Sequence, residues 1–280
     1  MPDKKPATFV SPWMLWCLRL FSWLVVGFLL LPIVVIIPLS FNAEPFFSFT
    51  PDMLRLKPEA YSWRWYQDVF DNPNWLLAIK NSFSIGIAAT LLATLLGTCA
   101  ALGLHQPALP YRRMITAILI SPMIVPLIII AAGMFFFYSR LNLVATYPGL
   151  ILAHTTLGAP FVVITVTASL TNLDPALYRA ALSLGASPWR AFRTVTLPLI
   201  KPGVLSGALF AFITSFDEIV LVLFLAGPKQ RTIPREMFAG LREQINPSIL
   251  AVATLLIMTS ILFLFCVALL KRNTQKTPAP

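Results

Sequence analysis

Long runs of apolar residues constrain this chain more than any other feature of its sequence. The run from Trp13 to Leu39 holds one charged residue, Arg19, and five further runs of more than 20 residues follow it. A helix needs about 20 apolar residues to cross the hydrocarbon core of a bilayer. In lipid a helix also satisfies its own backbone hydrogen bonds. The sequence therefore predicts an all-α membrane protein.

We place six transmembrane helices along the chain. The predicted spans cover residues 13–39, 81–104, 114–138, 148–171, 203–226 and 249–270. Around them lie an N-terminus at 1–12, a long connection at 40–80, a core of five spans at 81–271 and a tail at 272–280. The composition agrees, because only 11% of the residues are charged, against about 25% in soluble domains.

Lysine and arginine in the connections predict the orientation, because cytoplasmic loops carry an excess of them. With six spans both termini lie on one side, which holds 11 of the 21 basic residues, while the other side holds 9. The acidic residues divide more sharply, with two on the side of the termini and seven on the other. We expect both termini in the cytoplasm. We attribute the net charge of +10 to topology and contact with membrane lipid rather than to nucleic acid.

The cysteines and histidines give no sign of a metal or redox site. Cys17, Cys99 and Cys266 lie in apolar runs without the spacing of metal ligands, and His105 and His154 are far apart. A membrane enzyme would need such groups to converge, so we predict no catalytic residue, no metal and no cofactor. A self-sufficient carrier usually shows internal repeats, and no convincing repeat relates the two halves.

The outer connection contains the stretch YSWRWYQDVFDNPNW, which is rich in tryptophan and tyrosine. Such residues favour the membrane interface, where they form an aromatic belt. A docking surface for a partner outside the cytoplasm is the alternative, and the sequence leaves both open.

The connection between the fourth and fifth spans, residues 173–203, has recognisable helix signals. Asp174 is a good N-cap for a first short helix, and Gly185 can take the left-handed conformation that ends it. A second helix, WRAFRTVTL, follows, and Pro198 and Pro202 are expected to end it before the fifth span. The result is a helix, a glycine turn and a helix on the inner membrane face. It could transmit a partner's movement to the spans, or it could be an ordinary interfacial loop.

These residues resemble a family signature. The loop reads R-A-A, then glycine, then V-x-L-P, where the permease subunits of ATP-binding-cassette importers carry E-A-A…G…I-x-L-P. Arg179 stands where the signature has an acid, and Val195 replaces isoleucine, while the glycine and proline framework is intact. The resemblance covers roughly residues 60–270. It implies that ATPase coupling rests on Arg179, Ala180, Ala181, Gly185, Ala186, Leu197 and Pro198.

The resemblance also implies partners and a location. A second, related permease would complete the pathway, two cytoplasmic ATPase subunits would bind the coupling loops (residues 173–203 here), and a periplasmic binding protein would deliver the solute. The expected place is the bacterial inner membrane. This chain has no GxxxxGK[ST] phosphate loop, so ATP would be bound by the partner subunit rather than by this one.

Two adjacent acids, Asp217 and Glu218, lie inside the fifth predicted span. A carboxylate at that depth costs several kcal/mol unless it is hydrated or paired. If the span is one helix, Thr214 and Ser215 share a polar face with the two acids. These four residues are our candidate substrate pathway, a wall that attracts cations. The alternative is a structural ion pair with Lys80, Arg140 or the partner permease.

The stretches SFDEIV and PREMFAGLREQINPSILAVATLL resemble the subgroup of permeases that imports spermidine and putrescine. That resemblance implies a small cationic solute of the polyamine class, with carboxylates replacing the water around its ammonium groups. Phe135, Phe136, Phe137 and Tyr138 are candidate aromatic contacts, although such clusters more often serve packing. The alternative is an importer for another small ligand, such as an amino acid derivative, an opine, iron or a phosphonate, in which the acids are structural.

Overall fold

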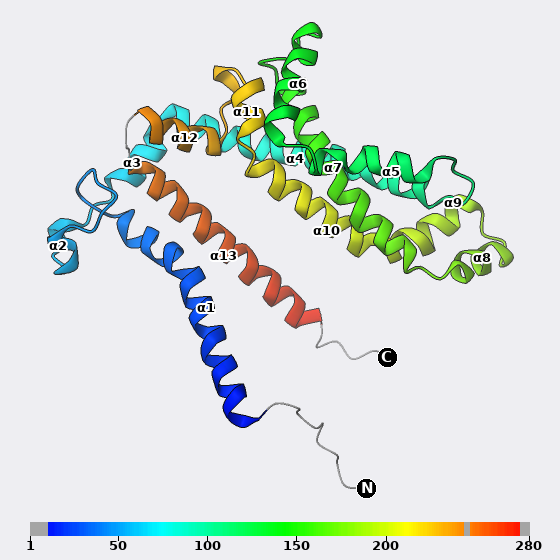
Figure 1. The fold of residues 1–280 in the computed structure, drawn as a ribbon, viewed down its shortest axis with the longest axis horizontal. Helices are drawn as coiled ribbons and strands as arrows, with labels where there is room; N and C mark the ends of the chain where they lie inside the picture. The colour runs from blue at the N-terminus through cyan, green and yellow to red at the C-terminus, as the bar shows by residue number, and fades with distance from the viewer. Residues whose placement is uncertain (1–10, 244–246, 275–280) are drawn as a thin grey trace. The chain divides into compact units, whose positions relative to one another are not determined.

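The computed structural model describes residues 11–243 and 247–274, which are mostly helical (Figure 1). The longer helices are α1 (Pro12–Leu39), α3 (Arg64–Asp71), α4 (Pro73–His105), α5 (Arg112–Ile120), α6 (Leu127–Arg140), α7 (Tyr147–Thr171), α8 (Pro175–Ser183), α10 (Leu197–Phe216), α12 (Ile233–Glu243) and α13 (Ser248–Thr274). The shorter ones are α2 (Pro51–Leu54), α9 (Pro188–Ala191) and α11 (Val220–Leu225), with single turns η1 (Pro58–Ala60), η2 (Ser121–Met123) and η4 (Pro228–Gln230) and a π-helical turn η3 (Phe192–Thr196). The described part holds no strand, only an isolated bridge between Asn42 and Tyr61.

The chain forms two compact units. The first unit joins the residues up to Asn72 with those from Gly240 onward, and the second unit runs from Pro73 to Ala239. The candidate site and the coupling loop both lie in the second unit.

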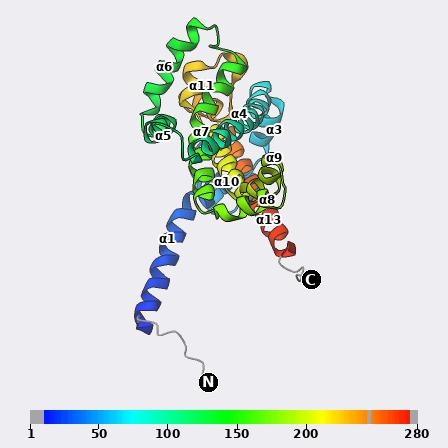
Figure 2. The ribbon, with the colours of Figure 1, turned by 90° about the vertical axis from the view of Figure 1, so that its right-hand side faces the viewer.

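Three long helices, α4, α7 and α10, pack side by side at the centre of the second unit (Figures 1 and 2). Small residues make this possible, because they let helix backbones approach closely where lipid offers little hydrophobic drive. In α4 every fourth residue is buried and small, at Ala89, Ala93, Gly97 and Ala101. A Cβ atom on Gly97 would lie 2.7 Å from the Cβ atom of Val162 on α7, so α4 and α7 touch through glycine.

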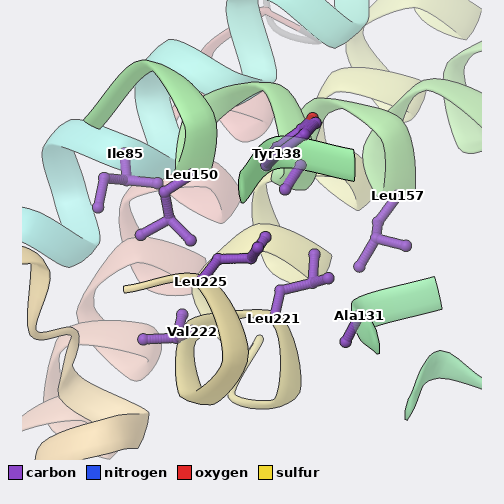
Figure 3. Close-up of a cluster of buried hydrophobic side chains, with 9 residues drawn as sticks. Ile85, Ala131, Tyr138, Leu150, Leu157, Leu221, Val222 and Leu225 are labelled. Atoms are coloured by element: carbon purple, nitrogen blue, oxygen red, sulfur yellow. The ribbon is translucent and has the colours of Figure 1, made fainter. Parts of the chain in front are cut away.

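The short helix α11 is anchored in an apolar cluster of the same unit (Figure 3). Its Leu221 and Val222 are fully buried. They belong to one cluster with Leu150 of α7, Ile85 of α4 and Ala131 of α6. The packing places α11 firmly, and so places the chain segment that precedes it.

Four helices of the described residues are long and apolar enough to span a membrane: Trp13–Leu39, Pro73–His105, Tyr147–Thr171 and Pro188–Phe216. A bent pair, Arg112–Met123 with Leu127–Arg140, makes a fifth if its two halves are one span. Ser248–Leu262 is a shorter apolar helix. The sequence predicted spans at all these places, but it placed the start of the second eight residues too late.

The third predicted span, at 114–138, is two helices rather than one. They meet at an angle of 99°. Pro122 and Pro126 lie at this bend, and proline both lacks a backbone N–H and disfavours helix at the residue before it. The same two prolines that the sequence showed inside the span therefore mark where it bends.

The coupling loop also differs from expectation at its second helix. The first helix, α8, begins at the Asp174 N-cap, whose Oδ1 atom accepts a 2.8 Å hydrogen bond from the backbone N–H of Ala176. The second helix was expected to end at Pro198 and Pro202, and that is wrong. The helix continues from α9 through η3 into α10, with Pro198 in the first turn of α10, where a missing N–H costs little, and Pro202 inside it.

In the first unit, α1 is an apolar helix, and its residues 13–38 are all exposed or half-buried. Such a helix suits lipid. Beyond it, the aromatic-rich segment at residues 41–72 folds on itself. Phe41, Trp63 and Tyr66 have ring centroids 4.9–5.3 Å apart, and the Tyr66 hydroxyl lies 2.7 Å from Ser40 Oγ. Part of this segment is thus a small core of its own, while Trp63 remains 66% exposed.

Candidate functional site

The two acids lie in a break between helices. Helix α10 ends at Phe216, α11 begins at Val220, and the N–H of Asp217 makes the last hydrogen bond of α10, to the carbonyl of Ile213 at 3.0 Å. The expectation of one continuous helix over 203–226 is therefore wrong. The shared polar face that it implied for the four candidate residues does not exist in that form.

The break separates the environments of the two acids. Glu218 is buried, with 7% of its surface exposed, and its Oε1 atom accepts a 2.8 Å hydrogen bond from the backbone N–H of Leu221. Asp217 is exposed. Among the side chains that the structure describes, none forms a hydrogen bond or an ion pair with the Asp217 carboxylate. Only one of the two acids is thus free to meet something outside this chain.

The turn of α10 before the break is tied to α7. Ser215 Oγ lies 2.8 Å from His154 Nδ1, and both side chains are buried. The Nε2 atom of His154 is also buried and has no hydrogen-bond partner in the described part of the chain. Ser215 is therefore a packing contact, and of the two polar residues expected beside the acids only Thr214 keeps partial exposure.

The structural ion pair that the sequence left open is not formed within this chain as described. The ion pairs among the described side chains are Lys57 with Asp52 and Arg231 with Glu236. Neither Lys80 nor Arg140 lies within ion-pair distance of the acids.

A polar network fixes the loop that follows α11. The side-chain amide of Asn81, on α4, donates hydrogen bonds of 2.8 Å to the carbonyls of Lys229 and Arg231. Its Oδ1 atom accepts one of 3.1 Å from the hydroxyl of Tyr147, on α7. Asn81 is 2% exposed, so its donors and its acceptor are used inside the protein. The end of α11 is held in this way to two of the central helices.

Two arginines lie close together beyond this network. Arg235 donates to the carbonyl of Gly227 at 2.8 Å, and Arg231 pairs with Glu236 at 3.1 Å. Burial, then the neighbouring Arg231, lowers the pKa of Arg235 from its ordinary value, and Glu236 partly offsets this. The loop thus carries positive charge that its own hydrogen bonds hold in place.

The glycine of the coupling loop adopts the predicted left-handed conformation, with φ +84°. The N–H of Ala186 bonds to the carbonyl of Ala181 at 3.1 Å, and that of Gly185 to Leu182 at 3.0 Å, which is the Schellman pattern of helix termination. Of the other residues assigned to coupling, four are exposed, namely Arg179, Ala180, Leu197 and Pro198, and two are half-buried, namely Ala181 and Ala186. They are accessible to a partner.

Comparison with known proteins identifies the family. Residues 91–276 match the model of the family described as binding-protein-dependent transport system inner membrane component. The chain belongs to this family. It is a non-catalytic permease subunit of an ATP-binding-cassette importer.

The permease has curated relatives along most of its length. It is 29% identical over 255 residues to the spermidine/putrescine transport system permease protein PotC of Haemophilus influenzae, covering 91% of this chain and 96% of the relative. It is 30% identical over 241 residues to the putrescine transport system permease protein PotI of Escherichia coli, covering 82% of each. A solved bacterial ABC transporter involved in the import of the acidic polysaccharide alginate shares the fold, with a TM-score of 0.68, 16% identity and coverage of 95% of this chain and 99% of that one.

Sequence reasoning found the acids of the permease and missed the residues that fix the chain before and after them. His154 and Asn81 each stood out as a polar residue in an apolar run, which was the available signal, but neither has a sequence neighbour that indicates its partner. The candidate aromatic contacts on α6 differ in their burial. Tyr138 is buried in the core, while Phe135 and Phe136 line an open apolar hollow with Phe224 of α11.

Proposed function

We propose that this permease forms, with a second related permease, a translocation pathway for a small cationic solute of the polyamine class. The observation that carries the proposal is the exposed carboxylate of Asp217, which has no partner among the described side chains and interrupts an otherwise apolar segment. A carboxylate in such a place is stable when it meets a cation or water. The names of the relatives, which include spermidine and putrescine, agree with this chemistry.

The proposal includes the remaining parts of an importer. Six spans would place both termini in the cytoplasm, with α13 as the sixth. The coupling loop would dock on one of two cytoplasmic ATPase subunits, since it is exposed and its turn is well defined. A periplasmic binding protein would deliver the solute to the outer face.

The test is uptake by the complete complex in proteoliposomes. Changing Asp217→Asn and Glu218→Gln together should abolish uptake of labelled spermidine and putrescine, while the complex still assembles. The matched control changes Glu59→Gln and Asp71→Asn, two exposed acids of the first unit, and removes the same charge elsewhere. Uptake that survives the first pair of changes as well as the second would refute the cationic pathway.

A further inference from the structure

The two adjacent acids at the break, Asp217 and Glu218, have different structural roles. Helix α11 starts without a helical turn before it, so its first backbone N–H groups need acceptors. Glu218 supplies one. Its carboxylate accepts a 2.8 Å hydrogen bond from the N–H of Leu221. The Glu218 carboxylate is therefore buried and is already hydrogen-bonded within its own chain.

The position of this cap is fixed from both sides. After the break, Leu221 and Val222 are fully buried among residues of α4, α6 and α7. Before the break, Ser215 is held to His154 of α7 by the 2.8 Å contact. The chain therefore enters and leaves the break at fixed points only a few residues apart, and Asp217 lies between them.

We propose that, of the two acids at the break, Asp217 is the one that meets the solute, and that Glu218 and His154 are positioning residues that hold the break so that Asp217 stays exposed. This inference rests on the proposed function and assigns different roles to the two acids within it. One carboxylate can meet one ammonium group, so the further amines of an elongated polyamine must be met by groups outside this break, such as those of the second permease.

The first experiment separates charge from positioning, using the complete complex in proteoliposomes and the KM for spermidine. Asp217→Asn should raise KM at least tenfold. Glu218→Gln should leave KM within about threefold of the parent, because its amide oxygen still accepts from Leu221. Glu218→Ala, which has no acceptor, should impair uptake, so the conservative variant rescues what the truncation loses.

The second experiment reads the geometry directly. In a background with the three native cysteines changed to serine, Asp217→Cys should react readily with a cationic thiol reagent. Its rate should fall at least tenfold when Glu218→Ala or Ser215→Ala is added. The matched control is Ser206→Ala, an exposed serine of the same helix, which should leave the rate unchanged.

The outcomes distinguish the two proposals. Two results would show that the roles assigned to the two acids are wrong while the cationic pathway stands. In the first, Glu218→Gln raises KM as much as Asp217→Asn does. In the second, Asp217→Asn alone has no effect, whereas Glu218→Gln abolishes uptake. An unchanged thiol rate in Glu218→Ala and Ser215→Ala also overturns the positioning role. If neither single change nor the double change affects uptake, the proposed function itself fails.

Discussion

Replacing Gly185 should weaken the coupling of transport to ATP hydrolysis, by an amount that depends on the residue introduced. Gly185 has φ +84°, and a Cβ atom built on it would meet nothing within 4 Å. The cost of a substitution is therefore conformational and not steric. It falls on the turn that orients α8 relative to α9.

The size of the effect follows from the backbone. An ordinary L-residue loses about 1–2 kcal/mol in the left-handed region, and this changes an equilibrium about 5–30-fold. Asparagine tolerates that region better, and a β-branched residue tolerates it least. We expect the population of the docking-competent loop to fall slightly for Gly185→Asn, 5–30-fold for Gly185→Ala and further for Gly185→Val.

The assay is the number of solute molecules imported per ATP hydrolysed, together with the affinity of the ATPase subunit for the permease, in proteoliposomes. Both quantities should fall least for Gly185→Asn, more for Gly185→Ala and most for Gly185→Val. The matched control is Gly103→Ala, a helical glycine with equally open space and no positive φ, where alanine stabilises the helix by about 0.5–1 kcal/mol. If Gly185→Val keeps full coupling, or if the three variants behave alike, the reasoning is refuted.

Two further predictions concern stability, measured as the thermal unfolding midpoint of the purified complex. Asn81→Ala removes three hydrogen bonds to the loop after α11 and to α7, and at about 0.5–1.5 kcal/mol each it should destabilise by about 1.5–4.5 kcal/mol; an unchanged midpoint would show that the network is dispensable. Gly207→Ala places a Cβ atom 2.5 Å from Thr165 Oγ1 and 2.7 Å from Val162 Cα, which should cost about 1–3 kcal/mol, whereas Gly133→Ala meets nothing within 4 Å and should not lower the midpoint.

Local chemistry explains which features could be read from the sequence. The N-cap at Asp174 and the left-handed turn at Gly185 depend on a few neighbouring residues, and both have the predicted geometry. The bend of the third span was signalled by its prolines. The contact of α10 with α7 had a signal too, in the spacing of four between Gly203, Gly207 and Ala211, which sequence reasoning did not use.

The break at 217–219 had no such signal. The stretch SFDEIVLV contains neither glycine nor proline, and its apolar residues continue the pattern of the span. Pro202 led to the opposite error. It was expected to end a helix, but it lies inside α10.

By itself, the sequence determined the class of this protein: an apolar helical chain with a coupling loop of recognisable pattern and two acids in a costly place. Only the tertiary structure decided that the span breaks at those acids, and that Glu218 is buried while Asp217 is exposed. The physical reason is that hydropathy and capping act between neighbours along the chain. Burial at the break and the contact that precedes it depend on residues of α4, α6 and α7, such as Ile85, Ala131 and His154, which lie 60 or more residues away along the chain.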